Sequence, residues 1–134
     1  MLAPFCQPVT RTSVFQLAST ALLLVIFWVA MYESLTYSYG LTLVLAVPAA
    51  AMTMRLFMLQ HDCGHGAFFP SPRANNIVGG LLGVVTLVPY AYWRRTHAIH
   101  HASSGNLDAR GLGDIDTLTV REYLGRSRWQ RLRY

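Results

Sequence analysis

Two long apolar runs fill much of the first half of the chain and limit the folds that it can adopt. The first run covers residues 14–32, where only Gln16, Ser19 and Thr20 are polar. A helix over this run is about 28 Å long, close to the ~30 Å hydrocarbon core of a bilayer. A signal peptide is the alternative, but its apolar region is shorter and small residues follow it, whereas "YESLTYSYG" follows here. We therefore predict a transmembrane helix over 14–32, preceded by an N-terminal tail at 1–13.

The second run covers residues 40–59 and predicts a second transmembrane helix. Pro48 is expected to kink this helix, because proline removes one backbone hydrogen bond. Arg55 lies near the end of the run, so its long side chain is expected to extend to the lipid head groups. The loop between the runs contains Glu33 and no arginine, whereas most arginines follow the second run. The positive-inside rule then places His61, just after the second run, on the cytosolic side.

The composition agrees with a membrane protein. Hydrophobic residues make up 53% of the 134 residues and charged residues only 13%, about half the share typical of soluble domains. The net charge is +5, and all eleven basic residues are arginines, which hints at a bacterial source and hence a bacterial cytoplasmic membrane. Beside such apolar runs, this charge predicts anionic lipid head groups as partners and no nucleic acid. The two cysteines, Cys6 and Cys63, form no disulfide framework or CxxC motif.

All five histidines lie in two short windows, "HDCGHGAFF" from His61 and "HAIHH" from His97. Residues three or four apart share one face of a helix, so His61 can pair with His65, and His97 with His100 and His101. A lone histidine is usually an ordinary surface residue, but two such clusters favour a metal site. Imidazole nitrogens suit iron, zinc, copper or nickel better than calcium or magnesium. The predicted ligands are His61, His65, His97, His100 and His101, and we predict no catalytic residue beyond them.

Nearby acidic residues are candidates for a supporting role. Asp62 is either a ligand or an acceptor that orients an imidazole, or else simply a charge at a helix end. Asp108, Asp114 and Asp116 are weaker candidates for the same role, since they lie in what reads as a solvated loop. Cys63 faces away from the histidine stripe of a regular helix, so we predict that it packs in the core.

The third apolar run, residues 77–88, separates the two histidine clusters. Its twelve residues cover only about 18 Å as a helix, although extension to Trp93 would let it just cross the bilayer. A single crossing would hold the clusters some 30 Å apart, far beyond metal–nitrogen bonds of about 2 Å. Three glycines and Pro89 also weaken a straight span. We therefore predict a segment that dips into the membrane and returns, or that lies along the cytosolic interface.

The remainder of the chain is polar and predicts a cytosolic segment over 102–134, after a histidine region at 61–101. "SSGNLDARGLGD" is typical of a loop. "TLTVREYLGRSRWQRLRY" predicts an amphipathic helix at the membrane surface, with Tyr123, Leu124, Trp129 and Leu132 among five arginines. The alternative is that it merely flanks a further span. The fold class predicted is an all-α integral membrane protein with two transmembrane helices, a short membrane-embedded or interfacial segment and a cytosolic histidine region.

The motifs "HDCGHGAFF" and "YWRRTHAIHHASSGNLDARGLGDIDTLTVREY" closely resemble the first two histidine boxes of membrane fatty acid desaturases, particularly bacterial acyl-lipid enzymes. The resemblance implies two iron ions held at the cytosolic face, with the five histidines as ligands. It implies that O₂ and two electrons, delivered by ferredoxin or a similar carrier, remove two hydrogens from an acyl lipid. The family also has a third histidine box and two further spans downstream. We therefore expect an N-terminal half, inactive without the C-terminal half.

Other functions share parts of this pattern. Related di-iron hydroxylases and carotenoid ketolases carry the same boxes, so they stay open as alternatives within the family. A metal transporter would place ionisable residues inside its spans, but neither run contains His, Asp or Glu. A haem protein would hold its cofactor between histidines on opposite sides of the ring rather than in a packed cluster. Acyl desaturation is therefore the function that the sequence favours.

Overall fold

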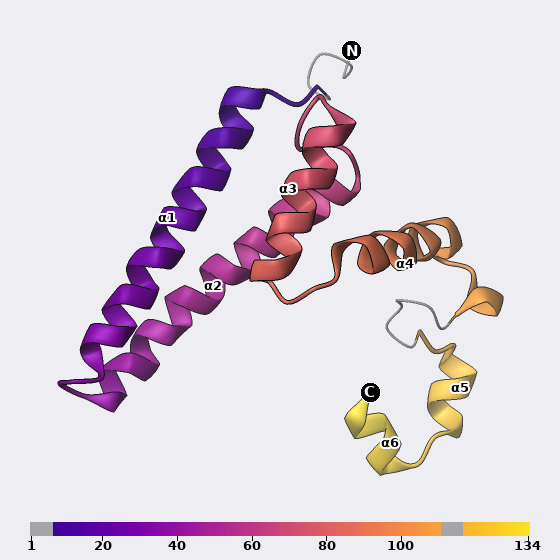
Figure 1. Cartoon of the computed structure of the whole chain (residues 1–134). Helices are drawn as coiled ribbons and strands as arrows, with labels where there is room; N and C mark the ends of the chain where they lie inside the picture. The colour runs from indigo at the N-terminus through magenta and orange to yellow at the C-terminus, as the bar shows by residue number, and fades with distance from the viewer. Residues whose placement is uncertain (1–6, 111–116) are drawn as a thin grey trace. The chain divides into compact units, whose positions relative to one another are not determined.

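The computed structural model describes residues 7–110 and 117–134, and within these ranges the chain is helical and contains no β-strand (Figure 1). The chain divides into two compact units, Met1–Arg94 and Arg95–Tyr134, whose boundary falls within one helix. This architecture confirms the predicted all-α class. The elements are α1 (Thr10–Ser34), α2 (Tyr39–Gly64), α3 (Pro72–Val85), α4 (Tyr90–Ser103), the short 3₁₀ helix η2 (Leu107–Ala109), α5 (Val120–Gly125) and α6 (Arg128–Arg133).

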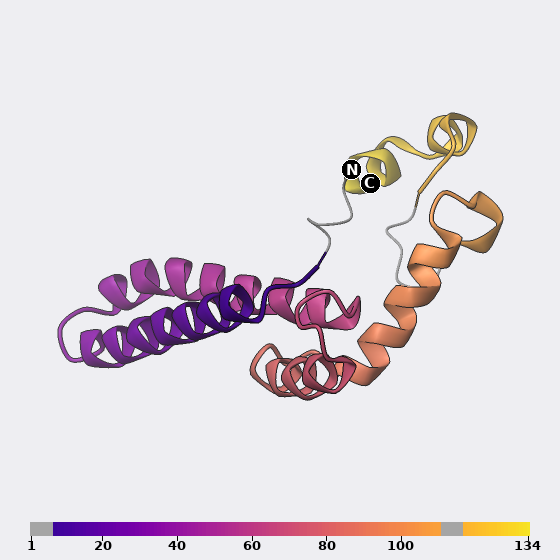
Figure 2. The ribbon, with the colours of Figure 1, turned by 90° about the horizontal axis from the view of Figure 1, so that it is seen from above.

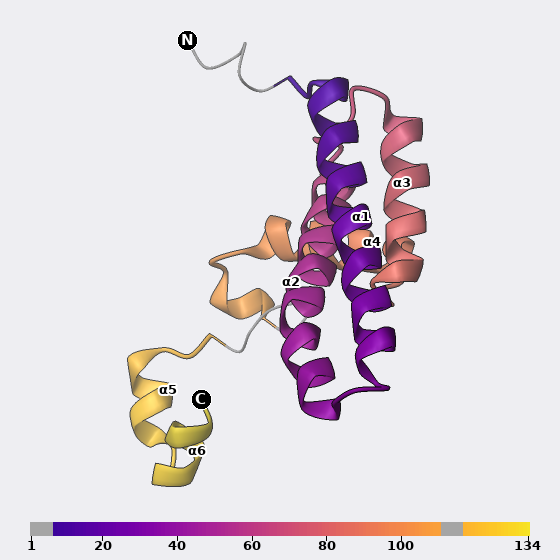
Figure 3. The same cartoon turned by 90° about the vertical axis from the view of Figure 1, so that its left-hand side faces the viewer.

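Helices α1 and α2 form an antiparallel pair that corresponds to the two predicted spans. Both are long and apolar enough to cross a membrane, with 25 and 26 residues. They lie side by side (Figures 2 and 3), and only residues 35–38 connect them. α1 begins at Thr10, inside the predicted tail, and α2 continues past the second run into the first histidine cluster, with Pro48 inside it. Most of their large apolar side chains are exposed, as expected of helices that face lipid.

Two side-chain hydrogen bonds join α1 to α2. Ser34 and Thr42 share a buried bond of 2.7 Å between their hydroxyl oxygens, next to the connection. Nearer the other end, Arg55 Nε donates to Thr20 Oγ1 at 3.0 Å. Arg55 was expected to extend to the lipid head groups, and the structure instead holds its guanidinium against α1. In a bilayer, such polar contacts between helices take over part of the role that apolar burial has in water.

The third apolar run does not form one straight helix. Ser71 caps α3 by accepting a bond from the Ala74 amide, and Pro72 stands at the first helical position, where no amide hydrogen is needed. The chain turns after Val85, and Leu87 adopts a left-handed φ of 58°. α3 and α4 are bent by 107° at this break, as in a broken span or a re-entrant segment. A straight crossing by residues 77–88 is therefore absent, while the path through the membrane stays a prediction.

Glycines on α3 permit a close approach of the turn and of the start of α4. A Cβ on Gly83 would lie 2.6 Å from the Val88 carbonyl oxygen, and one on Gly79 would lie 2.4 Å from the Tyr90 ring. Gly80, by contrast, has open space where a Cβ would stand. The α3–α4 turn therefore packs against the glycine face of α3.

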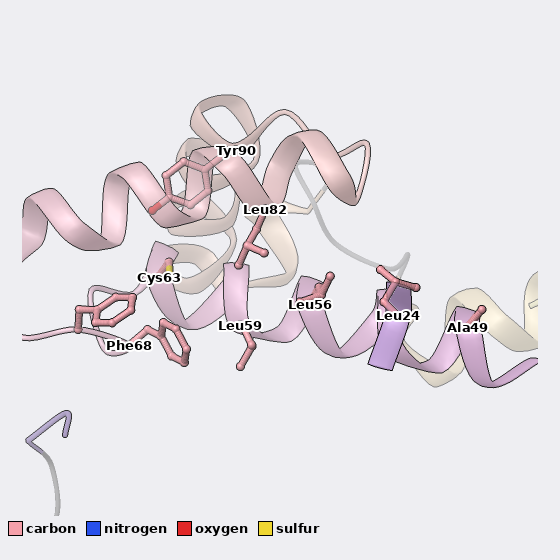
Figure 4. Packing of buried hydrophobic residues seen from close by; sticks show 9 residues of the cluster. Leu24, Ala49, Leu56, Leu59, Cys63, Phe68, Leu82 and Tyr90 are labelled. Atoms are coloured by element: carbon pink, nitrogen blue, oxygen red, sulfur yellow. The ribbon is translucent and has the colours of Figure 1, made fainter. Parts of the chain in front are cut away.

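The buried apolar residues of the first unit form a core that joins α1, α2, α3 and the start of α4 (Figure 4). Leu24 packs between the two long helices, and Leu82 and Tyr90 bring in α3 and α4. Cys63 is only 1% exposed, which confirms its predicted role in packing; Cys6 lies outside the described residues. The complete cluster comprises Leu24, Ala49, Leu56, Leu59, Cys63, Phe68, Phe69, Leu82 and Tyr90.

The arginine-rich tail forms two short helices rather than the single amphipathic helix predicted for it. Arg126 is extended, with ψ of 152°, so α5 stops before it. Thr119 caps α5 and Ser127 caps α6, each in a complete capping box with the residue three positions on. Arg110 and Glu122 form a bidentate ion pair with two contacts of 3.1 Å. This guanidinium, together with bonds from Thr119, lowers the pKa of Glu122 to about 2.

We predict that Gly83→Ala destabilises the chain, whereas Gly80→Ala leaves its stability unchanged or slightly raised. The added methyl at Gly83 meets a backbone oxygen, which cannot rotate away, and such overpacking costs about 1–3 kcal/mol. The methyl at Gly80 meets nothing and improves helix propensity by up to about 1 kcal/mol. Unfolding of the detergent-solubilised variants, followed by circular dichroism, measures both effects. Equal stability of the two variants would contradict the close packing of the turn.

Candidate metal centre

The first histidine cluster lies at the very end of α2. His61 is in the last turn of the helix and His65 caps it, and the two rings meet edge to face with centroids 4.5 Å apart. Their Nε2 atoms face each other at 3.3 Å. The predicted pairing of His61 and His65 on one helix face is therefore present in the structure.

Gly66 ends α2 immediately after the second histidine. Its φ of 70° is left-handed, which glycine adopts without steric cost. The Gly66 amide donates to the Cys63 carbonyl, and the Ala67 amide to the Asp62 carbonyl, as in a Schellman motif. The motif "HDCGHG" thus encodes both the histidine pair and the helix end that fixes it.

Two neighbours orient the His61 ring. Asp62 Oδ1 lies 3.4 Å from His61 Nδ1, on the side of the ring away from the Nε2 atom that faces His65. Trp93, in the first turn of α4, packs its ring 5.6 Å from the His61 ring. The same indole contacts Phe57 and leaves no room for a Cβ at Gly64. The start of α4 therefore lies along a stripe of α2 that includes His61.

The second histidine cluster lies in the last two turns of α4, within the second unit. His97 and His101 are four residues apart, and their Nε2 atoms face each other at 3.0 Å. His100 packs beside both, with ring centroids 5.9 Å from His97 and 5.5 Å from His101. This geometry repeats that of the first cluster.

Both pairs have the spacing of two ligands on one metal ion. For metal–nitrogen bonds of about 2.1 Å, nitrogens 3.0 and 3.3 Å apart subtend roughly 90° and 105° at a shared ion. These angles are normal for octahedral and tetrahedral coordination. A donor set made of imidazoles fits a transition metal such as iron and does not fit calcium or magnesium.

The predicted acidic residues differ in where they lie. Asp62 lies beside the His61 ring, which is the position that the predicted orienting role requires. Asp108 lies on η2, where its backbone amide donates to the Asn106 side chain. Asp114 and Asp116 lie outside the described residues. The roles of Asp62, Asp108 and Asp114 stay predictions.

Several residues that support the site were missed by reasoning from the sequence. The Gln60 side chain is fully buried next to His61, and its Oε1 accepts a bond of 2.7 Å from the Thr86 hydroxyl in the α3–α4 turn. Asn75 is also buried and bonds both the amide and the carbonyl of Phe69, in the loop that follows His65. The signal that could have revealed them is a polar amide within or beside an apolar run, since buried amides require partners.

Comparison with known proteins identifies the family. A family model described as "Fatty acid desaturase" matches residues 36–134. The chain belongs to the fatty acid desaturase family. The Bacillus subtilis protein named "Fatty acid desaturase" is 49% identical over 133 residues, which cover 99% of this chain and 38% of that protein. The chain thus spans well under half the length of this relative.

Other desaturases are similar over a shorter part of the chain. The Synechocystis protein named "sn-1 acyl-lipid omega-3 desaturase (ferredoxin)" is 51% identical over 40% of this chain and 15% of that protein. The Brassica napus protein named "Omega-3 fatty acid desaturase, chloroplastic" is 45% identical over 46% of this chain and 15% of that protein. No solved structure matches this desaturase chain.

We predict that His65→Ala weakens the binding of Co²⁺, used as a spectroscopic probe, by at least about tenfold. Loss of a residue that merely supports a ligand already costs this much, and His65 offers a ligand nitrogen directly. Titration of the purified chain, followed by the visible absorption of Co²⁺, measures the affinity. Tyr37→Ala, which removes an exposed ring in the connection between α1 and α2, serves as the control. Equal affinities of His65→Ala and the control would exclude the α2 pair as a metal site.

Proposed function

We propose that this chain is part of a membrane enzyme that desaturates acyl lipids at a di-iron centre held by His61, His65, His97, His100 and His101. The observation that carries the proposal is the pair of facing Nε2 atoms at the end of each histidine helix, at the spacing of two metal ligands. Family membership supports iron and O₂ as the cofactors. Two desaturase relatives span far more sequence than this chain, so the activity belongs to the whole protein.

The two histidine clusters contribute to one centre. Trp93 packs against His61, and His97 follows Trp93 by four residues on the continuous helix α4. Residues four apart share a helix face, so Trp93 and His97 lie on one face of α4. His61, His65, His97 and His101 each offer one ring nitrogen that could hold a metal ion.

The residues of the chain hold and orient the metal. When bound, the di-iron centre supplies the O₂-dependent removal of two hydrogens, which lies beyond the chemistry of side chains. The histidines would bind the metal through Nε2, and Asp62, whose Oδ1 lies 3.4 Å from His61 Nδ1, would orient the His61 ring for this role. Gly66 and Trp93 fix the position of the first pair. The protein thus contributes rigid ligand geometry.

An apolar groove along α2 is suited to the acyl chain. Its volume is about 510 Å³, and Phe57, one turn before His61, lies in its wall. The rest of the lining is mostly apolar, so a hydrocarbon chain gains about 0.8 kcal/mol for each CH₂ that it buries there. Because its lining includes residues spaced from 50 to 57 along α2, the groove runs along this helix toward the first histidine pair. It is lined by Ala50, Thr53, Met54, Phe57, Thr86 and Val88.

The histidines face the cytosol of a bacterial cell, where a soluble electron carrier reaches them. The concentration of arginines after α2 supports this orientation through the positive-inside rule. The Synechocystis relative is named as a ferredoxin-dependent enzyme, which supports ferredoxin or a similar carrier as the donor.

A chimera tests the proposal. The 134 residues replace the aligned part of the Bacillus subtilis relative, and the chimera is expressed in a host that lacks unsaturated acyl chains of its own. We expect mass spectrometry of the host lipids to show new double bonds. His61→Ala and His97→Ala should each abolish them, because each removes one ligand from its pair. Arg73→Gln, on the exposed side of α3, should leave them unchanged.

The lipid products of the chimera and of its histidine variants distinguish the possible outcomes. Hydroxylated products with the same dependence on His61 and His97 would replace desaturation by hydroxylation at the same centre. Double bonds that persist in His61→Ala would exclude this histidine as an essential ligand and would overturn the proposed centre.

A further inference from the structure

The two short helices of the tail carry more positive than negative charge. Residues 117–134 contain five arginines and one acidic residue, Glu122, which is paired with Arg110. Arg121, Arg128 and Arg133 are exposed and form no ion pair with any residue in 7–110 or 117–134. This surface therefore attracts an anionic partner.

The other two arginines, Arg126 and Arg131, stabilise the α5–α6 corner, which comprises residues 117–134. Arg131 donates to the carbonyls of Leu124 and Arg126, at the end of α5, and lies over the Tyr123 ring at 5.8 Å. Arg126 lies over the Tyr134 ring at 5.9 Å, and the Tyr134 hydroxyl accepts a bond from the Leu118 amide. Hydrogen bonds between residues of α5, of α6 and of the segments next to them therefore fix the geometry of the corner.

Large apolar side chains of the corner point into solvent. Val120 and Leu124 are four apart on α5, with exposures of 75% and 58%. Trp129 and Leu132 are three apart on α6, with exposures of 75% and 76%. Residues at these spacings share one face of a helix. Each short helix thus presents an unpartnered apolar pair.

On α6, arginines flank the apolar pair. Arg128 is four residues before Leu132, and Arg133 is four residues after Trp129, so each lies beside the apolar face. Such a pattern is typical of helices at the membrane interface. There, aromatic and aliphatic side chains insert among the acyl chains, while long cationic side chains extend to the phosphates of the head groups.

We propose that the α5–α6 corner binds the surface of the bilayer that α1 and α2 span, by inserting Trp129 and Leu132 while Arg128 and Arg133 contact anionic lipid head groups. The proposal is independent of the metal centre. A membrane surface is favoured over an acidic protein because the exposed residues are two apolar pairs in a chain already anchored in a bilayer. The negative charge of such a surface complements the unpaired arginines.

The test places an environment-sensitive fluorophore at Leu132→Cys in a chain in which Cys6→Ser and Cys63→Ala remove the native thiols. The whole chain is reconstituted in vesicles of zwitterionic lipid, with or without a phosphatidylglycerol component. We expect a blue-shifted emission, quenched by nitroxides on the acyl chains, only in the anionic vesicles. High salt should reverse the shift, because it screens the arginines.

Matched variants separate lipid binding from other causes. Arg128→Gln and Arg133→Gln should each lower the ratio of membrane-inserted to aqueous label about fivefold. Neither arginine side chain bonds to another described residue of the corner, and circular dichroism of the variants checks that the helices remain. Arg11→Gln and Arg73→Gln each remove the same charge from elsewhere and should leave the ratio unchanged. A label at Gly125→Cys, where a side chain has open space, should be quenched less.

Two outcomes would overturn the proposal. One is a label at residue 132 that stays in water in anionic vesicles, with intact helices. The other is a label that becomes shielded only after a soluble acidic protein is added, which would assign the surface to a protein partner.

Discussion

The region around the histidines depends on the tight turn between α3 and α4. Gly83 lets the Val88 carbonyl approach its Cα, Leu87 takes a left-handed conformation, and the Thr86 hydroxyl fastens the turn to the buried Gln60 amide beside His61. Because the chain bends by 107° at the turn, α4 begins against α2 with Trp93 beside the His61 ring. A straight continuation of α3 would carry this tryptophan away from the end of α2.

The features that the sequence predicts well are those set by local geometry. Hydropathy and length are sufficient for α1 and α2, since a span needs only about 20 apolar residues. The pairing of His61 with His65 follows from the helical repeat alone, because a spacing of four fixes one face whatever surrounds it. The exclusion of a straight third span came from glycine content and from the short apolar run, and these are local properties as well.

Contacts between distant residues were not predictable in the same way. Gln60 with Thr86, Asn75 with Phe69 and Arg55 with Thr20 each require knowledge of which helices meet. The break in the tail is a different case, because its signals were present: Thr119 and Ser127 each precede a Glu or Gln by three positions. The prediction of a single helix followed the apolar periodicity of the tail and left these capping boxes out. A capping box inside a periodic stretch marks the start of a new helix.

The four-residue connection between α1 and α2 has a consequence for the sidedness of the protein. Two antiparallel spans return the chain to the face of the membrane at which the first one begins, and the Ser13 hydroxyl, in the first turn of α1, donates to the Phe68 carbonyl beyond the histidine pair. The start of α1 and the histidine pair at the end of α2 therefore share one compartment. A reporter domain fused ahead of α1 would reveal, by its own location, the compartment into which His61 and His65 open.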